Sequence, residues 1–167
     1  LTSNNNYLVF NTAAAQDTDT GRWNDTSPTA SVFSLGDSGS TNGTSDAIVT
    51  YCIHSVEGYS RVGSWLGNND ADLGPFLYCG FRPAYVLIKE VDGTSNWDVH
   101  NDKTLGYNPD NDQLSADEDA LMKPNDFIDI ISNGVKIRTT DGGYNTDGNT
   151  YMFYAIAHSP FKTANAR

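Results

Sequence analysis

The chain has few positive charges. Ten Lys and Arg residues stand against 21 Asp and Glu residues, which gives a formal net charge of −11 at pH 7 and a sequence pI of about 4.3. The basic residues are scattered singly, so no basic stripe is present to follow a phosphate backbone. A surface of this sign repels nucleic acid and anionic lipid. The sequence therefore predicts a protein whose partners do not include nucleic acid.

Long hydrophobic runs are also missing. Hydrophobic residues make up 38% of the 167 residues, below the roughly 45–50% of typical domains. No run reaches the ~18 apolar residues of a membrane-spanning helix, so we expect no membrane insertion. Asn, Asp, Ser, Thr and Gly, which favour turns, are abundant instead. The length allows one domain or two small ones.

Cysteine is scarce, with only Cys52 and Cys79, each inside an apolar run. No C-x-x-C pair and no Cys/His cluster is present, which argues against structural zinc. Two alternatives stay open for the pair. The thiols form a disulfide if their two strands are neighbours, or they are free and buried, as free cysteines usually are.

The sequence is rich in short segments of Val, Ile, Tyr, Phe and Thr bounded by turn residues, which is typical of strands. Asn133-Gly134 predicts a hairpin with a type I′ turn, because both central residues of that turn need positive φ, and Asp92-Gly93 predicts another hairpin. Only 115–123 has a helical composition. We therefore predict an all-β fold, an antiparallel β-sandwich of jelly-roll or lectin-like type. The expected strands are 7–10, 30–35, 47–56, 75–81, 84–91, 96–100, 126–132, 134–140 and 150–159.

One sequence pattern occurs twice. "DAIVTYCIHS" and "TYMFYAIAHS" are both apolar runs that end in His-Ser, and they place His54 opposite His158. The match extends upstream, so that 7–63 corresponds to about 111–165. This spacing predicts an internal repeat.

The two copies differ in length. About three strands precede the second copy, and nothing equivalent precedes Tyr7. We expect a partial first repeat at 1–66, with its opening strands missing or upstream, and a complete second repeat at 67–167. The alternative is one joint sandwich in which the middle segment serves both halves.

Candidate metal ligands are present but poorly spaced. His54 and His158 occupy equivalent positions and could bind a metal or act as acid and base, but neither has a neighbouring carboxylate or Cys at ligand spacing. None of the acidic loops fits the twelve-residue calcium loop. We expect no cofactor, with calcium as the alternative. The candidate calcium ligands are Asp70, Asp72, Asp110 and Asp112.

Aromatic residues in polar surroundings are the best candidates for a binding site. Trp65, Trp97, Tyr107 and Tyr144 are flanked by Asn, Asp and Gly. Sugar CH groups stack on aromatic faces while nearby amides and carboxylates bind the hydroxyls. The alternative is that the tryptophans are core residues at strand ends. No G-x-S-x-G, no phosphate loop and no distinct carboxylate pair is present, so we expect no enzyme and no catalytic residue.

Several phrases carry a family resemblance across nearly the whole chain: "YLVFNTAAA", "W-x-x-T-S-P-T-x-S-V-F-S-L-G", "VEGYSRVGS", "CGFRPAYVLIK", "SNGVKIR" and "SPFKTANAR". Together they resemble a module of uncharacterised function in virion-associated proteins of tailed bacteriophages, many of them marine. The resemblance implies a lectin-like β-sandwich and a C-terminal fragment of a longer protein. It supplies no catalytic residues. The family leads us to expect an acidic residue where His54 and His158 stand here.

The resemblance implies a virion, and thus extracellular, structural protein. The first hypothesis is a tail-fibre or appendage module that binds host-surface glycan. The alternative is a capsid or tail decoration, or a filament subunit, with a purely architectural role. A depolymerase would need a carboxylate pair in a cleft. The expected partners are other copies of the chain, other virion proteins and host glycan.

Overall fold

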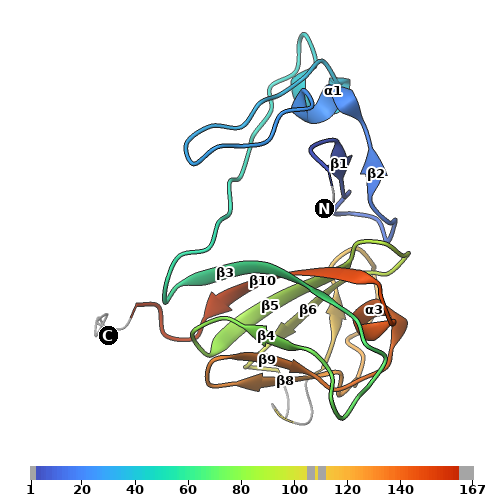
Figure 1. The fold of residues 1–167 in the computed structure, drawn as a ribbon, viewed down its shortest axis with the longest axis vertical. Coiled ribbons are helices and arrows are strands. Elements are labelled where there is room, and N and C mark those ends of the chain that lie inside the picture. Colours follow the sequence, from blue (N-terminus) through green and yellow to red (C-terminus); the bar gives the residue numbers. More distant parts are fainter. Residues whose placement is uncertain (1–2, 105–107, 109–111, 162–167) are drawn as a thin grey trace. The chain divides into compact units, whose positions relative to one another are not determined.

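A computed structural model describes residues 3–104, 108 and 112–161. The chain divides into two compact units, one of Leu1–Val9 with Gln16–Cys52 and one of Phe10–Ala15 with Ile53–Arg167. Its regular structure is mostly strand, in three antiparallel sheets (Figure 1). The prediction of an all-β, sandwich-like fold is confirmed. Among the described residues, no helix has the length and apolar character needed to cross a membrane.

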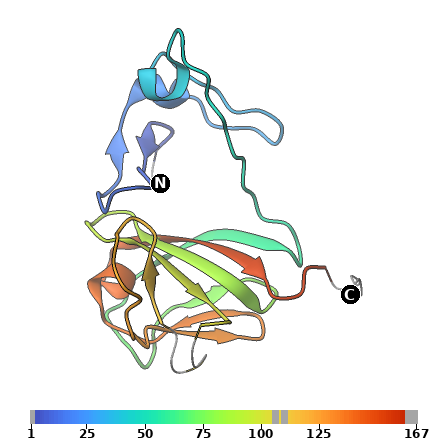
Figure 2. The same cartoon turned by 180° about the vertical axis from the view of Figure 1, so that it is seen from behind.

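The larger unit holds two stacked sheets, which both views show as two layers (Figures 1 and 2). The five-stranded sheet has the order β3-β10-β5-β6-β7 and the three-stranded sheet the order β4-β9-β8, with every neighbouring pair antiparallel. A one-turn helix, α3, precedes β10. The elements are β3 (Ser60–Leu66), β4 (Phe76–Tyr78), β5 (Pro83–Glu90), β6 (Trp97–Asn101), β7 (Leu114–Ser115), β8 (Ile128–Ile131), β9 (Gly134–Ile137), α3 (Gly142–Asn145) and β10 (Thr150–Ala157).

The core lies between these two sheets. Alternate residues of β10 point inward, as the period of two in a strand requires, so Tyr151 and Phe153 are buried while their neighbours are partly exposed. Trp65 stacks on Tyr151 with ring centroids 5.0 Å apart. Burial of each large aliphatic side chain contributes about 1.5–3 kcal/mol. The aliphatic core residues are Leu77, Val86, Ile88, Ile128, Ile130, Val135 and Ile137.

The smaller unit has little regular structure. It contains the short antiparallel pair β1 (Asn6–Tyr7) and β2 (Asp17–Thr18) and the one-turn helices α1 (Thr20–Trp23) and α2 (Gly39–Asn42). Among its described residues only Asn6 is buried. Arg22 lies over the Tyr7 ring, 3.7 Å from the centroid, which is a cation–π contact. This unit therefore has no apolar core of its own in the described residues.

The predicted strands within 75–101 and 126–159 are confirmed as β4, β5, β6, β8, β9 and β10. Other predictions were wrong. Residues 30–35 and 47–55 belong to no strand, although both are rich in residue types that favour strands. Among the described residues, no neighbouring strand completes their hydrogen bonds. Strand β3 was not predicted from the sequence. The segment 115–123, for which only a helical composition was noted, forms no helix.

The hairpin at Asn133-Gly134 is confirmed, but its predicted turn chemistry is wrong. Ile131 pairs with Gly134, so the connecting residues are Ser132 and Asn133, and none of Ser132, Asn133 and Gly134 has a positive φ. The need for glycine at position 134 is steric. A Cβ at position 134 would lie 2.1 Å from the carbonyl oxygen of Leu77. Gly134 therefore allows β4 to approach β9.

The chain passes from the smaller unit to the larger one between Cys52 and Ile53. Strand β3 was assigned to the first repeat from the sequence, but it pairs with β10 from Thr150↔Leu66 to Ile156↔Ser60. This pairing places β3 in the larger unit. The structure thus separates residues 60–66 from the apolar segment that precedes them.

Candidate functional site

A polar pocket of about 270 Å³ lies in the larger unit, where the start of β6 meets α3. Three stretches of chain form it: the turn between β5 and β6, residues 113–127, and the N-terminal end of α3. Its lining is mainly hydroxyl, amide and carboxyl groups. The residues that line it are Thr94, Ser95, Asn96, Asp98, Gln113, Lys123, Asn125, Phe127, Asp141 and Gly143.

The deepest charged group is Asp98, which is 3% exposed. Its Oδ1 accepts hydrogen bonds from Gln113 Nε2 at 2.5 Å and from Ser115 Oγ at 2.9 Å. Burial raises the pKa of this carboxyl, while the hydrogen bonds from Gln113, Ser115 and Tyr144 and the nearby Lys123 lower it. Burial is the largest effect, so the folded protein disfavours the ionised form.

Tyr144 of α3 connects Asp98 to His100. Its hydroxyl lies 2.7 Å from His100 Nε2, and both residues are buried. The pKa of Tyr144 is well above its usual value, first because the phenol is buried and then because Asp98 is close. The phenol therefore remains protonated and able to donate a hydrogen bond. This network fixes α3 against β6.

Amides and one aromatic ring complete the pocket wall. Asn125 Nδ2 donates to Gln113 Oε1 at 3.0 Å, and Asn96 Nδ2 lies 3.3 Å from Ser115 Oγ. The Phe127 ring packs edge-on against Tyr144, with centroids 5.0 Å apart. The pocket thus presents several hydrogen-bonding groups beside one apolar surface, which is an arrangement suited to a hydroxyl-rich ligand.

The aromatic residues that we expected in an exposed groove lie elsewhere. Trp65, Trp97 and Tyr144 are buried, so the prediction that their faces are open to a ligand is wrong. Trp65 belongs to the central core, and Trp97 packs against Phe10 with ring centroids 4.9 Å apart. The polar neighbours of Trp65 belong to the turn after β3, whereas those of Trp97 precede β6 or, like Asp98, lie within it. Tyr107 lies outside the described residues.

The acidic candidates do not converge. Asp70 Oδ1 accepts from the backbone N–H groups of Asp72 and Leu73, at 2.9 and 2.8 Å, and so closes a local turn. Asp110 lies outside the described residues, and Asp112 is partly buried in a different loop. Within the described part of the chain, no group of three His, Cys, Asp or Glu residues could hold a metal ion.

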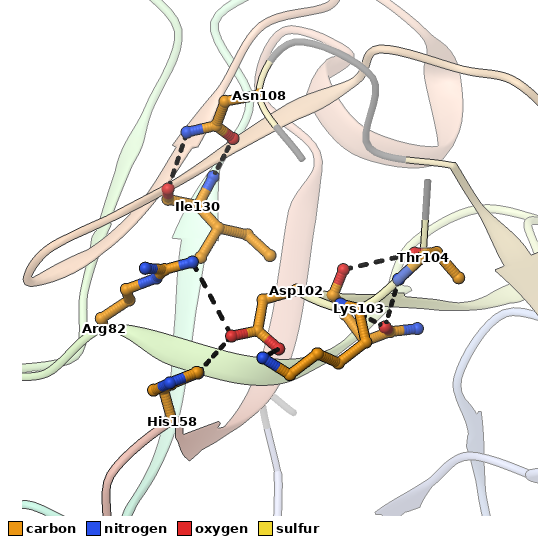
Figure 3. A network of polar contacts seen from close by, with 8 residues as sticks. Arg82, Asp102, Lys103, Thr104, Asn108, Ile130 and His158 are labelled. Carbon is orange, nitrogen blue, oxygen red and sulfur yellow. Dashed lines mark hydrogen bonds and ion pairs between the residues drawn. The ribbon is translucent and has the colours of Figure 1, made fainter. Parts of the chain in front are cut away.

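His54 and His158, which the sequence pattern pairs, have different surroundings. His158 Nδ1 contacts Asp102 Oδ2 just beyond β10, as Figure 3 shows. The Asp102 side chain is 1% exposed, and Arg82 Nη2 and Lys103 Nζ each lie 3.7 Å from one of its oxygens. His54 instead is exposed and places Nδ1 3.0 Å from the carbonyl oxygen of Ser55. The His158 cluster fastens the chain after β10 to the ends of β5 and β6.

The cysteines do not form a disulfide. Both are free, and Cys79 is buried while Cys52 is exposed. The alternative of free thiols therefore holds, but the expected burial of Cys52 is wrong. Burial raises the pKa of the Cys79 thiol to about 12.

The sequence reading missed the pocket residues, although one signal for them exists. In "NWDVHN" the period of two places Asp98 and His100 on one face of the strand. Asp98 pairs with Ile88, and His100 pairs with Val86, which are both buried core residues. Two polar side chains on a core-facing side indicate a buried polar network.

Comparisons with known proteins place the chain in a family. No curated protein matches the sequence, and no solved structure matches the fold. One family does match, over residues 1–160, and it is described as a domain of unknown function, DUF7483. The matched span includes most of both units. Because it covers nearly the whole sequence, the chain belongs to the DUF7483 family.

Proposed function

We propose that the protein is a non-enzymatic glycan-binding module of a bacteriophage virion, and that its larger unit binds sugar in the polar pocket beside β6. The observation that supports the proposal is the lining of the pocket, to which Asn96, Asn125 and Phe127 all contribute. Amides exchange hydrogen bonds with hydroxyls, and the ring offers an apolar face. The phage setting comes from the family resemblance of the sequence.

The charges near the pocket favour a neutral sugar. Asp98 and Asp141 both contribute to the lining, whereas Lys123 is its single cationic residue. The chain as a whole carries −11. A sugar that carries a carboxylate or sulfate would meet like charge here. We therefore expect neutral hexoses to bind better than their uronic acids.

The bonding of Asp98 favours binding over catalysis. Gln113 and Ser115 both donate to its Oδ1, so the carboxyl orients the side chains that surround it. A general base would need an accessible oxygen at the reacting proton. Asp98 is a positioning residue in this proposal, and the groups that would touch the sugar are Asn96, Asn125 and Phe127.

The test is a titration followed by amide NMR. Neutral hexoses and hexosamines are added to the ¹⁵N-labelled chain up to about 10 mM, since a single shallow site binds with a dissociation constant near ~1 mM, about −4 kcal/mol. The side-chain amide signals of Asn96 and Asn125 should shift. Asn125→Ala should weaken the binding, whereas Asn4→Ala, at an exposed position in the smaller unit, should not.

Two outcomes would contradict the glycan proposal. One is the absence of shifts at Asn96 and Asn125 for every sugar tested. The other is a set of shifts that Asn125→Ala leaves unchanged. In either case the architectural role becomes the better explanation of the fold.

The architectural role has an observation of its own. Val49 and Tyr51 expose 76% and 86% of their surface in a segment that forms no strand. Exposed apolar side chains that lie close together in the sequence favour contact with another protein surface. A decoration or filament subunit would use such contacts with other copies or other virion proteins. Sedimentation of the full chain over a range of concentrations tests this role directly.

A further inference from the structure

The loop-and-helix segment around α2 has the same local structure as the one around α3. In each helix the N-cap carbonyl accepts two backbone bonds: Ser38 O from Thr41 N and Asn42 N, at 3.0 and 2.8 Å, and Asp141 O from Tyr144 N and Asn145 N, also at 3.0 and 2.8 Å. The C-cap angles agree as well, with φ −62° and ψ 141° at Gly43 against φ −61° and ψ 132° at Thr146.

A side-chain bond repeats as well, at an offset of 103 positions. His54 and His158 are 104 positions apart, so the stretch between the helix and the histidine is one residue longer after α3 than after α2. Asn42 Nδ2 donates to the carbonyl oxygen of Gly36 at 2.8 Å, and Asn145 Nδ2 donates to the carbonyl oxygen of Thr139 at 2.8 Å. In both bonds the donor is the last residue of the helix, and the acceptor carbonyl belongs to the residue six positions earlier. The side-chain cap differs, since Asp141 accepts from Gly143 N whereas Ser38 makes no such bond. The cap angles and the six-residue amide bond are what the two loops share. The two segments therefore occupy equivalent places in two copies of one structure.

The strand that follows α3 has neighbours on both sides, whereas the segment that follows α2 forms no strand. β10 pairs with β3 along one edge and with β5 along the other. Residues 46–53 belong to no strand. With His54 placed opposite His158, the side chains of Val49, Tyr51 and Ile53 correspond to Phe153, Ala155 and Ala157, which are all buried. Ile53 exposes 57% of its surface.

We propose that residues 36–54 form the closing half of a second β-unit, and that a second copy of the β3–β6 half completes it. In that unit, residues 46–53 become the central strand between a β3-type and a β5-type strand. The incoming half supplies two strand edges and an apolar sheet face. These are the features that β10 uses in the larger unit.

His54 gives a separate reason for this occupant. At the end of β10 the equivalent His158 contacts the buried carboxylate of Asp102, which directly follows β6. The incoming half would bring its own copy of that carboxylate to His54. A ligand, a membrane or an unrelated protein would not supply these groups together.

The test is a fusion that restores the repeat. His54 and His158 lie 104 positions apart, so a copy of residues 55–104 joined directly to Leu1 reproduces the spacing of the larger unit. Hydrogen exchange is then measured on the backbone amides of 46–53. They should exchange at least about tenfold more slowly than in the unfused chain, where they have no strand partner. The amides of β10 are the internal reference for the folded larger unit.

A disulfide checks the register independently. Cys52 corresponds to Ile156, which lies opposite Ser60 in the pairing of β10 with β3. With Cys79→Ala in both halves, Ser60→Cys in the added copy should form a bond with Cys52, because opposed Cα atoms lie within disulfide range. Arg61→Cys in the same copy is the matched control. Its side chain points to the other face, and it should not form the bond.

Two results would overturn the proposal. In the first, residues 46–53 exchange in the fusion as fast as in the unfused chain, whether or not the added half is folded. In the second, they are already protected in the unfused chain in step with dimer formation, which would make a whole second chain the occupant. Neither result bears on sugar binding, because the pocket beside β6 contains no residue of 36–54.

Discussion

The Nε2 atom of His100 lies 2.7 Å from the hydroxyl oxygen of Tyr144, and this contact joins β6 to α3 behind the polar pocket. Both rings are buried, so neither polar atom has water as an alternative partner. The contact joins two elements that both contribute residues to the pocket lining. Its strength can be measured by removing one oxygen atom.

Tyr144→Phe removes that oxygen and keeps the ring. The free energy of unfolding should fall by about 1–3 kcal/mol, because His100 and Asp98 each lose a hydrogen bond in a buried place. Urea denaturation measures the change. Tyr51→Phe is the matched control, since Tyr51 is 86% exposed, and should change little. Equal effects of the two substitutions would contradict the network.

Asp98→Asn should change how stability depends on pH. Burial raises the pKa of Asp98 above its ordinary value of 3.8 in the folded chain. The folded state therefore holds this proton to higher pH than the unfolded state does, and stability falls as the pH rises from the ordinary value through the folded one. We expect the free energy of unfolding of the wild-type chain, relative to that of Asp98→Asn, to be lower at pH 7 than at pH 3. Urea denaturation at the two pH values measures it. A constant difference between the two proteins would refute the assignment.

The two thiols should react at very different rates. Cys52 is exposed, while Cys79 is buried and has a pKa of about 12, so almost none of it is thiolate at pH 8. A thiol-specific reagent added to the folded chain should label one cysteine, which peptide mass spectrometry should assign to Cys52. Labelling in denaturant should reach both. Rapid labelling of Cys79 in the folded chain would contradict its position.

Asp102→Asn tests the cluster that fastens the end of β10. The substitution keeps the shape but removes the charge that His158, Arg82 and Lys103 share. We expect the free energy of unfolding to fall by about 1–3 kcal/mol, since a buried charged hydrogen bond is lost. Asp119→Asn, at an exposed site, is the control and should have little effect. An unchanged midpoint for Asp102→Asn would show that the cluster contributes no stability.

Gly134→Ala should be destabilising for a steric reason alone. The added methyl group would lie 2.1 Å from the carbonyl oxygen of Leu77, so β4 and β9 must separate. A loss of about 1–3 kcal/mol is expected from overpacking of this kind. Gly39→Ala offers the comparison, because a Cβ there has no neighbour within 4 Å. Thermal unfolding of both variants separates the close approach from the general effect of glycine.

Four of the confirmed strands have local support in the sequence. β5, β6, β8 and β9 combine alternating apolar residues with Asp92-Gly93 or Asn133-Gly134, so their hairpins form between neighbours in sequence. β3 was missed because "SRVGSWL" contains Arg, Ser and Gly, and its pairing with β10 joins residues about ninety positions apart. The pairing of β3 with β10 is thus a long-range contact. No local pattern indicates it.

For residues 47–55 the error was the opposite one, because a strand was predicted and none is present. Their pattern is that of a strand, but a strand also needs a neighbour, and propensity alone does not provide one. The pocket was hidden for a related reason. Asp98 becomes a site residue only once its register with Ile88 places it on the inner face, and the Trp97 beside it faces the other way. Polar flanking residues made Trp97 look exposed, although it is buried.

The last strand of the larger unit is an inner strand of its sheet, since β10 lies between β3 and β5. During synthesis, both of its neighbours leave the ribosome before it exists. Until residues 150–157 emerge, the edges of β3 and β5 that face each other have no central strand to join them. Such edges pair readily with other chains. Completion of this sheet is therefore a late event in translation, and a nascent chain paused before Thr150 exposes strand edges that are prone to aggregation.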